Sequence, residues 1–185
     1  FGLVDGPGAG LRPVIPKDEK DRVMCYFEKG GADGAKVLVD GRNLSLQGYD
    51  DGFFVGGTLL DHVTPAMSVY RDEIFGPVLS VMRPQSYDEA VQLVMSHEYG
   101  NGTAIFTRDG DAAREFASTI NIGMVGVNVP IPVPVAYHSF GGWKASMFGD
   151  HSIHGMEGVR FYTKLQTVTA RWPSGIKDGA VFTFH

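Results

Sequence analysis

Residues 78–128 read VLSVMRPQSYDEAVQLVMSHEYGNGTAIFTRDGDAAREFASTINIGMVGVN, and this stretch decides the fold class. Short apolar runs predict strands at Val78 to Met82, Thr103 to Thr107 and Met124 to Asn128. The segments between these runs have helical periodicity. Strands that are apolar on both faces and alternate with helices are typical of a parallel sheet covered by helices, so we expect an α/β fold.

Two helix starts support this pattern. Ser86 and Glu89 have the spacing of a capping box, and the helix that they open should stop near Gly100. Asp109 or Asp111 can cap the second helix. Both helices therefore have a side chain that can satisfy the free N–H groups of the first turn.

The stretch after the third predicted strand runs from Asn128 to Asp150 and reads NVPIPVPVAYHSFGGWKASMFGD. Its alternating prolines cannot donate to a strand ladder, so the chain must leave the sheet there. Several aromatic residues follow, and Gly141 with Gly142 provides a hinge where the backbone can approach another group closely. The residues alone leave two interpretations open: a rigid wall of a ligand pocket, or a buried connector whose aromatic rings fill the core.

Glu73 and Phe75 lie just before the first predicted strand, in the stretch RDEIFGP at residues 71–77. The turn at Gly76 and Pro77 places the Glu73 carboxylate and the Phe75 ring at one end of the sheet. A carboxylate that accepts hydrogen bonds from a sugar diol, beside a ring that supports a flat heterocycle, suits nucleotide binding. The alternative is that Glu73 is an ordinary surface acid and Phe75 a core residue. Without further evidence, the residues alone favour this alternative.

The first part of the chain has weaker signals. Residues 1–15 are rich in glycine and proline and predict a loop, and because the chain begins at Phe1 within this loop, we expect it to be a fragment. Pro16 is placed to open a helix that Gly30 and Gly31 should end. Its apolar stripe consists of Val23, Tyr26 and Phe27. Further short strands are expected at Lys36 to Val39, Phe53 to Val55 and Thr58 to Leu60.

Candidate catalytic and metal-binding residues are few. Cys25 is the single cysteine, lies in the middle of the predicted helix and has no histidine at helical spacing to activate it, so we expect a bystander. His151 and His154 have the spacing of one helical face, but no acid or cysteine completes a metal site. We therefore expect no metal and no catalytic residue in this chain.

The C-terminal residues 161–172 read FYTKLQTVTARW and predict one long strand after a loop at Gly149 to Gly158. A terminal strand with no helix after it leaves an edge with which another chain can pair. We expect strand addition between subunits, against the alternative that the strand closes its own sheet. Residues 173–185 predict a tail.

Composition restricts the class of protein. The net charge is -5 at pH 7, with acids and bases mixed along the chain, which argues against a nucleic-acid or membrane-surface role. The length of 185 residues suits one domain with a small appendage, and no segment approaches membrane-spanning length. A single cysteine fits a reducing compartment, so we expect a cytoplasmic protein, or one of the mitochondrial matrix in a eukaryote.

Several motifs together resemble the aldehyde dehydrogenases. The stretch from Glu73 to Pro77 (EIFGP) is similar to the cofactor motif of that family. The resemblance continues, in the family's order, through YGNGTAIFT, GMVGVN, FGGWK and LQTVT, and it covers nearly all the chain. Within the family, the proline run and the stretch HSFGGWK followed by FGD are most similar to the methylmalonate-semialdehyde dehydrogenase branch, which is acylating and uses coenzyme A.

The resemblance implies roles for four residues. Glu73 would bind the hydroxyls of the nicotinamide ribose of NAD, and Phe75 would pack by the nicotinamide ring. Phe140 would line the substrate tunnel, with Pro134 near it. Residues 1–158 would be part of the catalytic domain and residues 159–172 an oligomerisation strand that makes a homodimer or homotetramer.

The resemblance also implies a reaction, in which a cysteine attacks a semialdehyde, NAD takes the hydride and coenzyme A takes the acyl group. With loss of carbon dioxide, the product would be propionyl-CoA or acetyl-CoA. The family places its nucleophilic cysteine and its dinucleotide-binding domain upstream of the region that matches, and Cys25 does not match the family's cysteine motif. We therefore expect this chain to be inactive alone, and the alternative is a non-catalytic module for assembly or partner binding.

Overall fold

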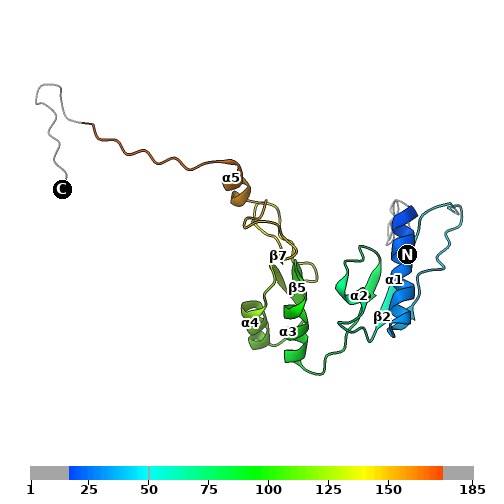
Figure 1. Cartoon of the computed structure of the whole chain (residues 1–185). Coiled ribbons are helices and arrows are strands. Elements are labelled where there is room, and N and C mark those ends of the chain that lie inside the picture. The colour runs from blue at the N-terminus through cyan, green and yellow to red at the C-terminus, as the bar shows by residue number, and fades with distance from the viewer. Residues whose placement is uncertain (1–16, 50, 173–185) are drawn as a thin grey trace, which may run out of the picture.

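The computed structural model describes residues 17–49 and 51–172. The predicted loop at 1–15, the helix start at Pro16 and the tail at 173–185 lie outside this range. A first lobe (residues 17–82) and a second lobe (residues 86–148) follow one another along the chain. A C-terminal arm (residues 163–172) extends away from both (Figure 1). Among the helices of the described residues, none is long and apolar enough to cross a membrane.

The first lobe contains a three-stranded sheet and two helices. The helices are α1 (Lys17–Ala32) and α2 (Ser68–Arg71), and the strands are β1 (Lys36–Val39), β2 (Thr58–Asp61) and β3 (Val78–Ser80), in that order across the sheet. β1 runs antiparallel to β2, and β2 runs parallel to β3. The predicted strands at Lys36 and Thr58 are confirmed, whereas residues 53–55 form no strand and reach the core as irregular chain.

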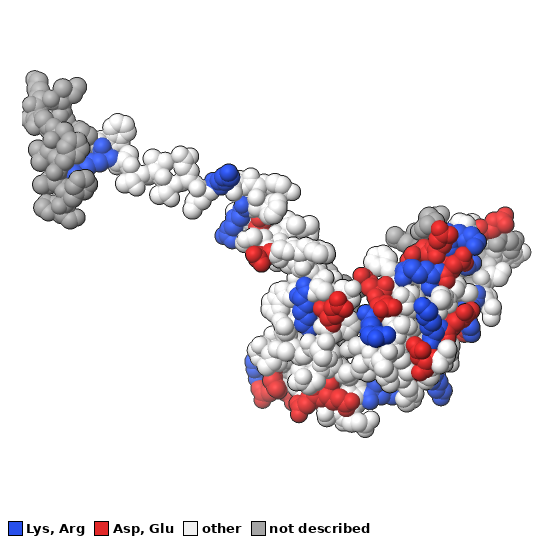
Figure 2. All heavy atoms as spheres, viewed as in Figure 1, with Lys and Arg blue, Asp and Glu red and all other residues white. Residues whose placement is uncertain are grey.

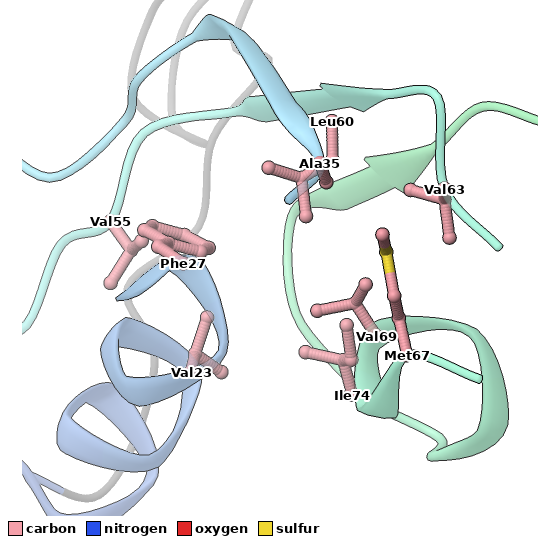
Figure 3. Packing of buried hydrophobic residues seen from close by; sticks show 9 residues of the cluster. All are labelled: Val23, Phe27, Ala35, Val55, Leu60, Val63, Met67, Val69 and Ile74. Atoms are coloured by element: carbon pink, nitrogen blue, oxygen red, sulfur yellow. The ribbon is translucent and has the colours of Figure 1, made fainter. Parts of the chain in front are cut away.

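The core of the first lobe lies between α1, α2 and the sheet (Figure 3). Val23 and Phe27 of α1 are 0% and 2% exposed and pack in one cluster with Leu60 of β2, which confirms the predicted apolar stripe. A Cβ atom at Gly30 would lie 2.7 Å from a methyl carbon of Leu60. Gly30 therefore allows close packing of the helix on the sheet. The prediction that it ends the helix is wrong, because α1 continues to Ala32.

The second lobe contains two helices and two pairs of strands. Its helices are α3 (Tyr87–Ser96) and α4 (Gly110–Thr119). Its strands are β4 (Tyr99–Gly100), β5 (Gly102–Ile105), β6 (Met124–Val127) and β7 (Trp143–Lys144). β5 runs parallel to β6, and β4 runs antiparallel to β7. A second buried cluster, centred on Phe116 of α4, packs against α3 and the parallel strands β5 and β6.

Both predicted helix caps are confirmed. The Ser86 hydroxyl accepts a hydrogen bond of 3.1 Å from the N–H of Glu89, and the Asp109 carboxylate accepts two from the first turn of α4. Helix α3 stops at Ser96, before the predicted stop near Gly100, because His97 has an extended backbone with ψ of 142°. Strand β4 therefore begins at Tyr99, three residues after the end of α3.

The predicted single parallel sheet is wrong in one respect. Among the described residues, β3 pairs with β2 and not with β5, so the strand, helix, strand order does not close into one sheet. Leu79 of β3 is 63% exposed, and this degree of exposure is typical of a strand face without a covering layer. Local pattern predicted β3, β5 and β6, but pairing depends on which edges meet in space.

Asn128 explains how the chain leaves the sheet after β6. Its φ is 58°, which asparagine tolerates better than most residues. Its side chain accepts a hydrogen bond of 2.9 Å from the N–H of Thr107 and donates one of 3.0 Å to the Thr107 carbonyl. The side chain thus replaces the next backbone pair of the ladder, and the proline-rich segment that follows forms no strand, as predicted.

The C-terminal segment differs from the prediction. Helix α5 (Met156–Tyr162) occupies the first residues of the expected strand, so that prediction is wrong for Phe161 and Tyr162. Residues 163–172 are all exposed, pair with no other strand of the described chain and lead away from both lobes (Figure 1). Threonine and valine favour extended chain, but a strand needs a partner to complete its ladder.

Charged side chains are mixed over the surface. Figure 2 shows acids and bases side by side on both lobes. One ion pair has a buried carboxylate. Asp61 is 4% exposed and accepts two hydrogen bonds of 2.8 Å from the Arg83 guanidinium. This bidentate pair joins the end of β2 to the connection that leaves the first lobe.

A stability test follows from the Asp61 pair. Hydrogen bonding to Arg83 lowers the pKa of Asp61 from 3.8 to about 2. A carboxyl whose pKa is lower in the folded state stabilises that state above its ordinary pKa, and this stabilisation is lost as the pH falls through 3.8 to about 2. We expect Asp61→Asn to lower the Tm at pH 7 and the difference from the wild type to shrink over that acid range. Thermal unfolding followed by circular dichroism checks this, and a difference that stays constant down to the lowest pH would contradict it.

Candidate functional site

A polar cleft of about 400 Å³ lies where the two lobes meet. One wall is the turn between α2 and β3, and the other comes from β4 and the residues after β7. The lining residues are Arg71, Asp72, Glu73, His97, Tyr99, Asn101, Ala145 and Ser146. The cleft has the volume of small-ligand sites and brings Glu73 to side chains that the sequence motifs did not single out.

Helix α1 fixes the wall that carries Glu73. The Tyr26 hydroxyl donates a hydrogen bond of 3.0 Å to the Asp72 carboxylate, and the Arg22 guanidinium donates to the carbonyl oxygen of Ile74. A Cβ atom at Gly76 would lie 2.7 Å from a methyl carbon of Val23, so only glycine lets the turn pack this closely on α1. The turn is therefore held from one side at three successive points.

Phe75 points outward from this turn. Its φ is 53°, which costs an L-residue roughly 1 to 2 kcal/mol, and its side chain is 81% exposed. Ile74, not Phe75, is the buried residue, so the interpretation of Phe75 as a core residue is wrong. Strained backbone that presents an apolar ring to solvent is a feature of ligand-binding sites.

The Glu73 carboxylate is available for a ligand. The side chain is exposed, and none of the described residues donates a hydrogen bond to it or forms an ion pair with it. A carboxylate with free lone pairs in a cleft can accept two hydrogen bonds from vicinal hydroxyl groups. These residues therefore fit the ribose of a nucleotide.

The opposite wall is anchored to the C-terminal end of α3. The Lys144 ammonium donates hydrogen bonds to the carbonyl oxygens of Val94 (3.3 Å), Met95 (2.8 Å) and His97 (3.1 Å). The Ser146 hydroxyl accepts a hydrogen bond of 3.0 Å from the N–H of Gly100. Sequence reasoning missed this use of Lys144, since the partners lie far away along the chain.

The two glycines of FGGWK lie against neighbouring segments of the chain. A Cβ atom at Gly142 would lie 2.7 Å from the Ser146 Cβ and 3.2 Å from the Asn101 side-chain oxygen. A Cβ atom at Gly123 would lie 2.0 Å from the Gly141 carbonyl oxygen. The close approach predicted for these glycines is confirmed, and it fixes Asn101 and Ser146 at the cleft.

Phe140 and Pro134 lie elsewhere on the proline-rich segment. Phe140 is half-buried and stacks on His154, with ring centroids 4.2 Å apart and planes 9° apart, while Pro134 is exposed. Neither residue is among those that line the cleft. The interpretation of this segment as a core plug is wrong, because Tyr137 and Phe148 are 75% and 101% exposed.

The remaining chemical candidates form no site. Cys25 is exposed on α1, on the solvent side of the apolar stripe as predicted. His151 pairs with Glu157 at 3.0 Å, and His154 stacks on Phe140, so these histidines have separate surroundings.

Comparisons with known proteins agree with this geometry. The model of the aldehyde dehydrogenase family matches residues 5–168. The malonate-semialdehyde dehydrogenase of Pseudomonas aeruginosa is 56% identical over 90% of the chain and 33% of its own length. The bovine mitochondrial methylmalonate-semialdehyde/malonate-semialdehyde dehydrogenase, whose name carries the term acylating, is 47% identical over 91% of the chain and 31% of its own length.

Solved structures have the same fold. The methylmalonate-semialdehyde dehydrogenase of Oceanimonas doudoroffii is 55% identical with a TM-score of 0.88, over 92% of the chain and 35% of that structure. An aldehyde dehydrogenase of Mycobacterium tuberculosis complexed with NAD+ is 29% identical with a TM-score of 0.76, over 86% of the chain and 32% of that structure. The chain thus spans about a third of the length of the curated relatives that it matches.

Proposed function

Because the chain belongs to the aldehyde dehydrogenase family, we propose that it is the later part of the catalytic domain of an NAD-dependent, coenzyme A-acylating semialdehyde dehydrogenase. The substrate is methylmalonate semialdehyde or malonate semialdehyde, and its carboxyl group leaves as carbon dioxide, so that the product is propionyl-CoA or acetyl-CoA. The observation that carries the proposal is the Glu73 carboxylate in the cleft, which has no hydrogen-bond or ion-pair partner among the described residues and lies two residues from the outward-facing ring of Phe75. The names of relatives that are 47% to 56% identical support the substrate class.

Each site residue has a defined task in this proposal. Glu73 accepts hydrogen bonds from the hydroxyls of the nicotinamide ribose, and Phe75 supports one side of the nicotinamide ring. NAD, when bound, supplies the hydride acceptor for oxidation of the aldehyde carbon. Phe140, held by its stack on His154, lines the path of the semialdehyde, with Pro134 near it.

The nucleophilic thiol of the reaction is not Cys25. That residue is exposed on α1, a helix that holds the Glu73 turn but contributes no side chain to the lining of the cleft. The thiol comes from a part of the protein beyond these 185 residues, and this chain supplies one wall of the site. The term acylating in the name of the bovine relative supports transfer of the acyl group to coenzyme A.

The C-terminal arm has a role in assembly in this proposal. Residues 163–172 present free backbone N–H and C=O groups and exposed apolar side chains, among them Leu165 at 98% and Trp172 at 90% exposure. An extended segment of this kind is suited to add a strand to a second copy of the protein. The assembly is a homodimer or homotetramer, in the cytoplasm of a bacterium or the mitochondrial matrix of a eukaryote.

The test uses the full-length protein that contains this chain. With methylmalonate semialdehyde, NAD and coenzyme A, we expect NADH formation by absorbance and propionyl-CoA by mass spectrometry. The Cys25→Ser variant serves as a control and should retain nearly all of the activity, because its thiol lies outside the cleft. A free acid as the product with coenzyme A present would contradict the acylating reaction. No NADH from either semialdehyde would favour a non-catalytic assembly module.

A further inference from the structure

We propose that His97 is a positioning residue that fixes the distance between the two walls of the Glu73 cleft. His97 directly follows α3, and its imidazole contacts the end of α2 on one side and the start of β4 on the other. The proposal rests on the proposed function, in which Glu73 binds the nicotinamide ribose. His97 is the C-cap residue of α3, and it lines the cleft together with Glu73 and Tyr99. It therefore stands where movement of one wall relative to the other would change the width of the cleft.

The first contact of the ring holds the Glu73 wall. The Nε2 atom of His97 lies 3.0 Å from the carbonyl oxygen of Tyr70, which is in the last turn of α2. Carbonyl groups in the last turn of a helix have no partner within the helix and need one elsewhere. Tyr70 is three residues before Glu73, so this bond fixes the backbone from which Glu73 projects.

The second contact holds the opposite wall. The N–H of Tyr99 donates a hydrogen bond of 3.1 Å to the Nδ1 atom of the same ring. Tyr99 starts β4 and is two residues before Asn101, which lines the cleft across from Glu73. One planar ring thus spans the two walls with a hydrogen bond at each end.

The partners assign the form of the ring. A backbone N–H can only donate, so Nδ1 accepts, and a carbonyl oxygen can only accept, so Nε2 carries the proton. Both contacts are therefore satisfied together by the neutral Nε2–H tautomer.

Aromatic and side-chain contacts keep the ring in place. The rings of Tyr70 and Tyr99 lie on either side, with centroids 4.9 Å and 5.9 Å from that of His97. The Tyr70 hydroxyl donates a hydrogen bond of 3.0 Å to the Leu93 carbonyl in α3. The two lobes are thus joined at Tyr70 by its backbone and by its side chain.

Two substitutions separate the two ends of the ring. Asparagine at position 97 reproduces the reach of Nδ1, so it keeps the bond from Tyr99 and loses the bond to Tyr70. Glutamine reproduces the reach of Nε2, so it keeps the bond to Tyr70 and loses the bond from Tyr99. In the full-length enzyme we expect His97→Asn to raise KM for NAD by about fivefold, as loss of one hydrogen bond implies. His97→Gln should stay within about twofold of the wild type, because it keeps the contact with Tyr70 that fixes the wall carrying Glu73. KM for the semialdehyde should change in neither variant.

Stability and a distant control decide between positioning and a structural role. The Tm of each variant is measured beside its kinetics, and Thr119→Ala, which removes a 2.8 Å hydrogen bond at the end of α4, serves as the control. Equal values of KM for NAD in the asparagine and glutamine variants would overturn the proposal, whatever their Tm. If those values are equal but Glu73→Gln raises KM for NAD, the nucleotide site stands and the role of His97 does not. If Glu73→Gln also has no effect, the nucleotide site itself is wrong.

Discussion

Replacing Glu73 with glutamine in the full-length enzyme is expected to raise KM for NAD by roughly 10- to 100-fold, since hydrogen bonds to a charged group contribute roughly 1.5 to 3 kcal/mol. Glutamine keeps the size of the side chain and one acceptor oxygen but loses the charge and the second acceptor. The turn around Glu73 should not move, because Tyr26, Arg22 and Val23 hold its neighbours and not Glu73 itself. Steady-state kinetics at varied NAD, with direct binding measured by quenching of protein fluorescence, gives the change.

A matched control for Glu73→Gln is Glu115→Gln, which removes an exposed carboxylate from α4. This variant should behave as the wild type, because Glu115 does not line the cleft. If both variants leave KM for NAD unchanged, the assignment of Glu73 to the ribose is incorrect. If both raise it, the effect comes from net charge and not from a specific contact.

Replacing Lys144 with methionine is expected to lower the free energy of unfolding by about 3 kcal/mol, because three carbonyl oxygens at the end of α3 lose an ionised donor. Methionine fills a similar volume but donates no hydrogen bond, and it also removes a cation from the negative end of the helix. Urea unfolding followed by circular dichroism measures the change. We also expect KM for NAD to rise, since Ala145 and Ser146 directly follow Lys144 and line the cleft.

The control for this prediction is Lys36→Met, on the exposed strand β1. This variant loses the same charge without a carbonyl partner, so its unfolding midpoint should match that of the wild type. Lys144→Arg should be intermediate, because a guanidinium retains the charge but not the compact geometry of an ammonium. A wild-type midpoint for Lys144→Met would show that the hydrogen bonds at the end of α3 contribute no net stability.

Much of the local structure and part of the site could be predicted from sequence. The caps at Ser86 and Asp109 and the buried stripe on α1 depend on residues within a turn or two of each other, and these predictions are confirmed. The family motif pointed to Glu73 and Phe75, and the structure places Glu73 in a cleft and the ring of Phe75 in solvent. The roles of Glu73, Phe75, Phe140 and Pro134 in binding all stay predictions.

By itself, then, the sequence determined the α/β class, the positions of most helices and strands and the family, because these depend on spacing along the chain and on short motifs. The tertiary structure alone decided which strands pair, that residues 163–172 have no strand partner among the described residues, that His97 lines the cleft, and that Lys144 bonds the carbonyl groups at the end of α3. The contacts of His97 with Tyr70 and of Lys144 with Met95 join residues 27 and 49 positions apart. Such contacts form only where distant segments are brought within hydrogen-bonding distance, and no local pattern records that distance.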